Sequence, residues 1–161
     1  MKPVLLLVDL QGDFLDSTGL QPPPQCLVSQ TASLLRGCRK KKIPVIHIWT
    51  TIRRDDDRRM PHWKATGRWH CVAGTAGHKT PTPLQPFEHE TVINKCGFNG
   101  FAGGSLDAAL TKINCDTVVI AGIHLHTCVR TLAAESLERG LRIFIPEDAV
   151  ATNDPVFALS C

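Results

Sequence analysis

Three residues whose side chains could act together in nucleophilic catalysis each lie beside an apolar, strand-like segment. Cys128 lies in VVIAGIHLHTCVRTLAAESLERG, where an apolar run gives way to an amphipathic segment, while Asp9 follows VLLLV and Lys95 follows TVIN. A cysteine nucleophile needs a proton acceptor, a cation to stabilise charge, and donors for the oxyanion that forms when a carbonyl is attacked. Asp9 could be the acceptor and Lys95 the cation, and the turn before Cys128 could supply the donors.

The position of Cys128 at the start of a helix-like segment predicts a reactive thiol. Backbone N–H groups and the helix dipole favour a thiolate there, and such sites lower a thiol pKa from about 8.5 toward roughly 3.5–7.5. The same cysteine could instead be a metal ligand or a small core residue. An aspartate after a strand is often a turn residue and a lone lysine is usually solvated. The catalytic interpretation therefore depends on whether the three side chains converge.

The order of strand-like and helix-like segments indicates how they could converge. Apolar runs predict strands at residues 4–8, 43–50, 91–93, 117–121 and 142–145, and helical periodicity predicts helices at 25–41, 105–113 and 128–139. Ser105 is the expected N-cap of the second helix. This order predicts an α/β, doubly wound (Rossmann-like) three-layer sandwich with a mainly parallel sheet of five or six strands. Ligands in such sheets bind beyond the carboxyl ends of the strands, where Asp9, Lys95 and Cys128 are all expected.

Residues 51–86 interrupt this alternation. They contain the charged run RRDDDRR, several prolines and glycines, Trp63 and Trp69, and no sustained hydrophobic period. We predict a long excursion with a short helical turn. Because a loop of this length in a compact domain is usually functional, the excursion is expected to contribute to a site.

Length and composition indicate one globular domain spanning residues 1–161, whose last element, starting at VFAL, could be truncated at the C-terminus. A chain of this size buries about 70% of the surface that its unfolded form exposes, so it needs no disulfide bond or metal ion for stability. The net charge of +3, from scattered Lys and Arg, indicates neither nucleic-acid nor membrane binding, and no apolar run reaches the ~18 residues of a membrane span. Seven cysteines without a CxxC pair predict reduced thiols in a cytoplasmic protein.

Four ordered segments resemble the isochorismatase-like cysteine hydrolase superfamily: VDLQGDF, HCVAGTAGHKTPTPLQP, VINKCGFNGFAGGSLDAAL and VVIAGIHLHTCVRTLAAESLERG. The resemblance spans nearly the whole chain and implies a catalytic triad of Asp9, Lys95 and Cys128. It also implies a non-proline cis peptide between Ile123 and His124, and assembly as a homodimer or homotetramer.

The resemblance further implies hydrolysis of a C–N bond in a small amide, ureido or carbamoyl substrate through a thioester intermediate. Substrate-binding or oxyanion roles are expected for Ile123, His124, Thr127, Phe14 and Phe98, with the backbone N–H groups of Thr127 and Cys128 as oxyanion donors. A substrate carboxylate could bind Arg53, Arg54 or Arg130. No cofactor or metal is expected, although the spacing His124-x-His126-x-Cys128 leaves a metal site open.

Departures from the family pattern narrow this expectation. Metal-binding nicotinamidases of the family have an aspartate-x-histidine pair after the second strand, but this chain has TTIRRDDD there, which disfavours a metal-bound nicotinamidase. True isochorismatases, which cleave a vinyl ether, generally lack the cysteine. A vinyl-ether hydrolase and a catalytically silent binding or assembly module remain the alternatives. A haloacid dehalogenase-type phosphatase is excluded because Gln11 stands where a second aspartate is required, and the glycine spacing does not fit a dinucleotide site.

Overall fold

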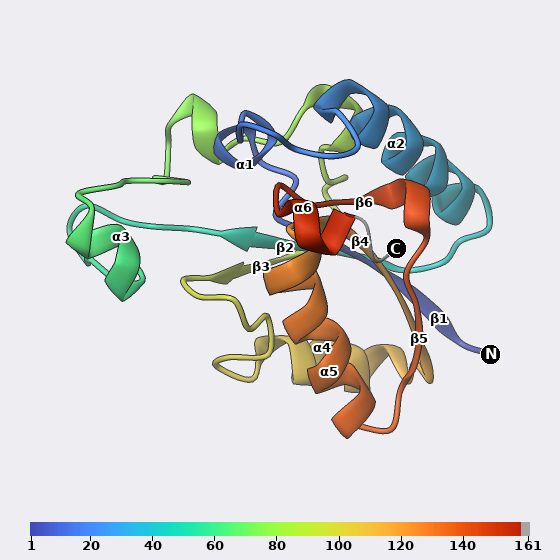
Figure 1. Cartoon of the computed structure of the whole chain (residues 1–161). Coiled ribbons are helices and arrows are strands. Elements are labelled where there is room, and N and C mark those ends of the chain that lie inside the picture. The colour runs from blue at the N-terminus through green and yellow to red at the C-terminus, as the bar shows by residue number, and fades with distance from the viewer. Residues whose placement is uncertain (159–161) are drawn as a thin grey trace.

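The computed structural model describes residues 1–158 as a parallel six-stranded sheet between layers of helices (Figure 1). The strands are β1 (Pro3–Val8), β2 (Val45–Thr50), β3 (Thr91–Lys95), β4 (Thr117–Ile123), β5 (Arg142–Phe144) and β6 (Val150–Ala151). Their order is β3-β2-β1-β4-β5, with β6 also paired to β4, and every pairing is parallel. The predicted α/β doubly wound class is therefore confirmed.

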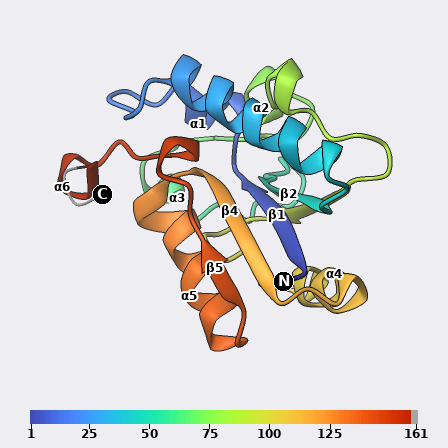
Figure 2. The same cartoon turned by 90° about the vertical axis from the view of Figure 1, so that its right-hand side faces the viewer.

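Helices cover both faces of the sheet (Figure 2). They are α1 (Gly12–Leu15), α2 (Pro24–Lys40), α3 (Pro61–Ala65), α4 (Ser105–Ile113), α5 (Arg130–Glu138) and α6 (Pro155–Ala158). Among the described residues, none of these helices has the length and apolar character that crossing a bilayer requires. Helix α2 lies on one face, while α4 and α5 lie on the other.

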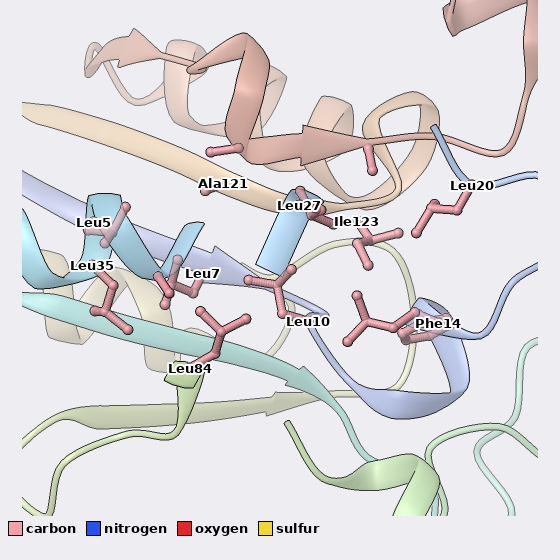
Figure 3. Packing of buried hydrophobic residues seen from close by; sticks show 14 of the residues in the cluster. Leu5, Leu7, Leu10, Phe14, Leu20, Leu27, Leu35, Leu84, Ala121 and Ile123 are labelled. Carbon is pink, nitrogen blue, oxygen red and sulfur yellow. The ribbon is translucent and has the colours of Figure 1, made fainter. Parts of the chain in front are cut away.

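Strand β1 contributes to two hydrophobic cores because its side chains alternate between the faces of the sheet. Leu5 and Leu7 pack in the cluster that contains Leu27 and Leu35 of α2 (Figure 3), whereas Val4 and Leu6 belong to the cluster with α4 and α5. A strand buried on both faces needs an uninterrupted apolar run. This accounts for VLLLV and fixes the central strand, at whose end Asp9 lies.

Several element boundaries differ from those predicted. Helix α4 begins at Ser105 with Gly104, in the left-handed conformation, as its N-cap, so the prediction of a Ser105 cap is wrong. A π-helical turn, η3 (Leu125–Val129), precedes α5, so the helical segment begins three residues before Cys128. Helix α1 and strand β6 were not predicted. Helix α6 lies at the expected VFAL segment, and the last residue of that segment lies outside the described residues.

The excursion of residues 51–86 is hydrogen-bonded to helix α1, which follows β1. It contains α3 and two short 3₁₀ turns, and its α3 lies beyond the arrowhead of β2 in Figure 1. The Asp13 carboxylate accepts a hydrogen bond from the Cys71 N–H at 2.6 Å, and the Gly12 N–H donates to the Lys79 carbonyl at 2.9 Å. These bonds place the excursion over the carboxyl edge of the sheet.

Gly122 provides a test of the packing between β1 and β4. Its φ is +138°, and a Cβ there would collide with the backbone carbonyl of Val8. We expect Gly122→Ala to destabilise the protein by more than about 3 kcal/mol, measured by urea unfolding. The matched control is Gly37→Ala, inside α2 with no atom near the added methyl, which should raise stability by about 0.5–1 kcal/mol. Equal effects of the two variants would contradict this packing.

Candidate active site

The structure brings Asp9, Lys95 and Cys128 together at the carboxyl edge of the sheet. Lys95 Nζ lies 2.7 Å from Asp9 Oδ2 and 3.5 Å from Cys128 Sγ. The side chains of Asp9 and Lys95 are each only 1% exposed, and Cys128 is buried. Asp9 follows β1, Lys95 ends β3, and Cys128 lies in the turn η3 after β4. The sequence predicted this convergence from strand ends alone.

Thr50, the last residue of β2, fills the gap between the ends of β1 and β3. It is paired in register with Lys95. Its hydroxyl donates to Asp9 Oδ1 at 2.8 Å and accepts a hydrogen bond from Lys95 Nζ at 2.9 Å. Its backbone N–H also donates to Asp9 Oδ1, at 2.9 Å. Thr50 therefore holds both members of the ion pair, a role that the sequence did not predict.

Gln11 holds Thr50 in turn. Its side chain accepts a hydrogen bond from the Thr50 N–H at 2.8 Å and donates to the Thr50 carbonyl at 2.9 Å and to the His78 carbonyl at 2.8 Å. The amide thus ties the end of β2 to the excursion. Asp9 itself has a φ of +53°, in a region where aspartate is among the few residues that are readily accommodated.

The environment of Cys128 keeps its thiol protonated. Burial, followed by the charge of Asp9, raises the pKa of Cys128 to about 12, although Lys95 opposes this shift. Burial would lower the pKa of Lys95, but the charge of the neighbouring Asp9 raises it above its usual value. The lowered thiol pKa predicted from the helix position is therefore wrong: dehydration and the adjacent carboxylate outweigh the lysine. The resting site pairs an ammonium and a carboxylate next to a neutral thiol.

The expected oxyanion donors differ in their availability. The Thr127 N–H donates to the His124 carbonyl at 3.1 Å, so it already has a partner. Cys128 lies in the first helical turn, where N–H groups lack partners along the helix, so its N–H fits the donor role better. The Ile123–His124 peptide bond is cis, as the family resemblance implies.

A cavity of about 230 Å³ opens onto the thiol. Of the five residues expected to bind substrate, His124, Thr127, Phe14 and Phe98 line it, whereas the Ile123 side chain packs in the hydrophobic core. Residues from the excursion also line it: Met60, His62, Trp63, Arg68 and His70. The excursion therefore contributes to this cavity, as its length suggested, although the sequence did not single out His62, Arg68 or His70.

The arginines considered as binding residues for a substrate carboxylate lie outside the lining of this cavity. Arg53 forms an exposed ion pair with Asp55 at 2.6 Å, and the Arg54 guanidinium lies 4.7 Å from the ring centroid of Trp69. Neither these two residues nor Arg130 lines the cavity, whereas Arg68 does. The excursion has no regular hydrophobic period, so Arg68 could not be singled out from the sequence.

The histidines beside the cysteine form no evident metal site. Within residues 1–158, no cluster of three or more His, Cys, Asp or Glu side chains has the arrangement needed to hold a metal ion. The ring centroids of His124 and His126 lie 5.6 Å apart, and His126 Nδ1 lies 2.6 Å from the Thr152 hydroxyl, within hydrogen-bonding distance. The His-x-His-x-Cys spacing thus places two rings side by side without a complete ligand set.

His124 should make stability depend on pH. Burial, with a further contribution from His126, lowers its pKa to about 4. Because the unfolded state binds a proton more readily, the stability present above about pH 6.5 is lost as the pH falls toward 4. We expect a loss of about 2–3 kcal/mol from this group by pH 4.5. Urea unfolding at pH 7 and 4.5 should show a smaller acid loss in His124→Gln; identical losses would refute the assignment.

The fold and this cluster define a class: a doubly wound α/β protein with a cysteine, a lysine and an aspartate in contact at the carboxyl edge of its sheet. Residues 3–158 match the isochorismatase domain family model. The chain belongs to the isochorismatase family.

The similar proteins share a low sequence identity with this chain, but the similarity extends over nearly all of it. The chain is 26% identical to the secreted isochorismatase effector Isc1 of Verticillium dahliae, covering 94% of this chain and 73% of that protein. It is 28% identical to a streptothricin hydrolase of Streptomyces noursei, covering 93% of this chain but only 50% of that protein. The solved N-carbamoylsarcosine amidase of Thermoplasma acidophilum has a TM-score of 0.83 and 31% identity, covering 98% and 89% of the two chains.

Proposed function

We propose that this chain is a cysteine hydrolase that cleaves the C–N bond of a small amide, ureido or carbamoyl substrate through a thioester intermediate. The observation that carries the proposal is the contact of one ammonium, Lys95 Nζ, with both the Asp9 carboxylate and the Cys128 sulfur beside a cavity. The names of two similar proteins, a streptothricin hydrolase and an N-carbamoylsarcosine amidase, support hydrolysis of this kind.

The first half of the reaction forms a bond between sulfur and carbon. Because the thiol rests protonated, its proton moves to Asp9 as Sγ attacks the carbonyl carbon. Lys95 stabilises the negative charge that develops on sulfur, and the Cys128 N–H donates to the oxyanion. Protonated Asp9 then gives its proton to the leaving nitrogen. The C–N bond breaks, ammonia or an amine departs, and the acyl group remains on Cys128 as a thioester.

The second half regenerates the thiol. Asp9, again a carboxylate, takes a proton from water as the water oxygen attacks the thioester carbon. The carbon–sulfur bond breaks, and the sulfur recovers the proton from Asp9. The products are a carboxylic or carbamic acid and ammonia or an amine. Thr50 holds Asp9 and Lys95 in place throughout, so that one carboxylate can serve as base and acid in both halves.

A substrate screen tests the proposal. The purified chain should release ammonia from at least one member of a panel of simple amides, carbamoyl amino acids, ureidoacrylate and biuret. Isochorismate tests the vinyl-ether alternative, which the name of the Verticillium relative keeps in view. Cleavage of isochorismate without ammonia release from any amide would overturn the proposal in favour of that alternative. No turnover of any compound would favour a binding or assembly module.

A further inference from the structure

The backbone of His124 is fixed relative to the candidate nucleophile. His124 directly follows β4 and precedes the turn η3, which contains Cys128. Its carbonyl accepts hydrogen bonds from the N–H groups of Thr127 at 3.1 Å and Val129 at 3.2 Å. These bonds close the turn around the cysteine. Any group that the His124 side chain contacts in the cavity therefore lies at a defined position relative to the reacting sulfur.

The His124 ring is held on two sides. The Phe14 ring meets it edge-to-face at a centroid distance of 5.8 Å, and the His126 ring lies 5.6 Å away. His126 is itself positioned by the Thr152 hydroxyl, 2.6 Å from its Nδ1. Because both neighbours are fixed, the imidazole presents a defined edge to the cavity that it lines.

One nitrogen of this ring has no hydrogen-bond partner among the described residues. That nitrogen is His124 Nδ1, and it is buried. A buried polar group without a partner costs free energy, and in native structures it calls for an explanation. His124 lines the cavity, and because Nδ1 is enclosed, Nε2 is the nitrogen that we assign to a ligand there. A neutral imidazole has one donor and one acceptor nitrogen.

The neutral charge state of the His124 imidazole suits a hydrogen bond rather than an ion pair. Burial and the neighbouring His126 lower the pKa of His124 to about 4, so the imidazole is neutral near pH 7. A neutral histidine held in this way can donate a hydrogen bond to a substrate oxygen, a pattern known from other enzymes that keep a catalytic imidazole uncharged. The neutral imidazole would bind a correctly placed acceptor atom, without attracting anions from solution.

We propose that His124 is a specificity-determining residue whose Nε2–H donates a hydrogen bond to the acyl part of the substrate, selecting amides with an acceptor oxygen near the scissile carbonyl. This inference rests on the proposed function and adds a substrate class to it: β- or γ-oxo amides and similar compounds, in preference to purely alkyl amides. Phe14 and His126 act as positioning residues for the ring.

Two matched pairs of amides test the proposal. Acetoacetamide differs from butanamide, and 4-oxopentanamide from pentanamide, by a carbonyl in place of a methylene. The wild-type chain should hydrolyse at least one oxo amide with a kcat/KM about 10- to 100-fold above that of its alkyl partner. His124→Phe keeps a ring against Phe14 but removes the donor, and should bring the ratio of kcat/KM for the oxo amide to kcat/KM for its alkyl partner down to near one. His124→Gln, a neutral donor of similar reach, should retain part of the preference.

The outcomes separate this inference from the function on which it rests. If His124→Phe lowers kcat/KM for both members of a pair equally, or if the wild type shows no preference, the specificity role is wrong while amide hydrolysis stands. If the wild type releases ammonia from none of the four amides, the proposed substrate class is wrong, and the broader panel decides the function. Circular dichroism and urea unfolding at pH 7 verify that each variant is folded.

Discussion

Replacing Cys128 with alanine should abolish amide hydrolysis, lowering kcat/KM by at least about 10⁴-fold on any substrate that the wild type accepts. The sulfur forms the covalent bond in the proposed mechanism, and the methyl group of alanine cannot form it. The assay is ammonia release by the purified, folded variant. Because Cys128 is a small buried residue, its truncation should leave the fold intact.

The control for this variant is Cys26→Ala. Cys26 is an exposed free cysteine in α2, so its loss should leave kcat/KM unchanged. Urea unfolding of both variants separates loss of chemistry from loss of fold. Wild-type activity in a folded Cys128→Ala protein would show that the sulfur is not the nucleophile.

The Asp9→Asn variant should have opposite effects on hydrolysis and on thiol reactivity. Hydrolysis should fall by about 10²- to 10⁴-fold, since the amide cannot accept the thiol proton or pass it to the leaving nitrogen. The carboxylate raises the pKa of Cys128 and Lys95 lowers it, so removing the carboxylate should increase the thiolate fraction. Alkylation of Cys128 by iodoacetamide at pH 7.5 should therefore become at least about 10-fold faster.

Peptide-level mass spectrometry measures this alkylation and provides an internal reference. Burial, followed by the charges of Asp9 and Asp13, raises the pKa of Cys71 well above its usual range, so Cys71 also responds to the substitution. The exposed Cys26 is therefore the reference, and its alkylation rate should be the same in both proteins. Asp9→Asn leaves Lys95 without its carboxylate partner in a buried site, which is expected to destabilise the fold by about 3–5 kcal/mol, and unfolding must be measured alongside. If hydrolysis and alkylation of the folded variant decline together, Asp9 supports thiolate formation rather than proton transfer.

The centre of the sheet could be predicted because strands β1 and β4 are buried on both faces. The uninterrupted runs before Asp9 and within residues 117–121 have no other simple interpretation, and helical periods between such runs require parallel connections. The existence of the excursion could be predicted but its path could not, because that path depends on long-range bonds such as that between Asp13 and the Cys71 N–H. Its short turns are held by those contacts rather than by local hydrophobic periodicity.

The sequence predicted which three residues form the candidate site, but not the direction in which the pKa of its thiol is shifted. Strand ends placed Asp9, Lys95 and Cys128 at one edge, and the structure brings them into contact. The sequence could not show that Thr50 would lie between them, because a threonine at a strand end has many ordinary uses. It also could not show how deeply Cys128 is buried. That burial, with the carboxylate, reverses the expected direction of the thiol pKa shift.

The proposed mechanism requires that an acyl group is transferred to the sulfur of Cys128. Rapid acid quenching of the enzyme during turnover, followed by intact-protein and peptide mass spectrometry, tests it most directly. We predict an adduct with the mass of the substrate acyl group on the peptide containing Cys128, released by hydroxylamine and absent from Cys128→Ala. Steady ammonia release with no adduct on Cys128, together with undiminished turnover by Cys128→Ala, would contradict the account.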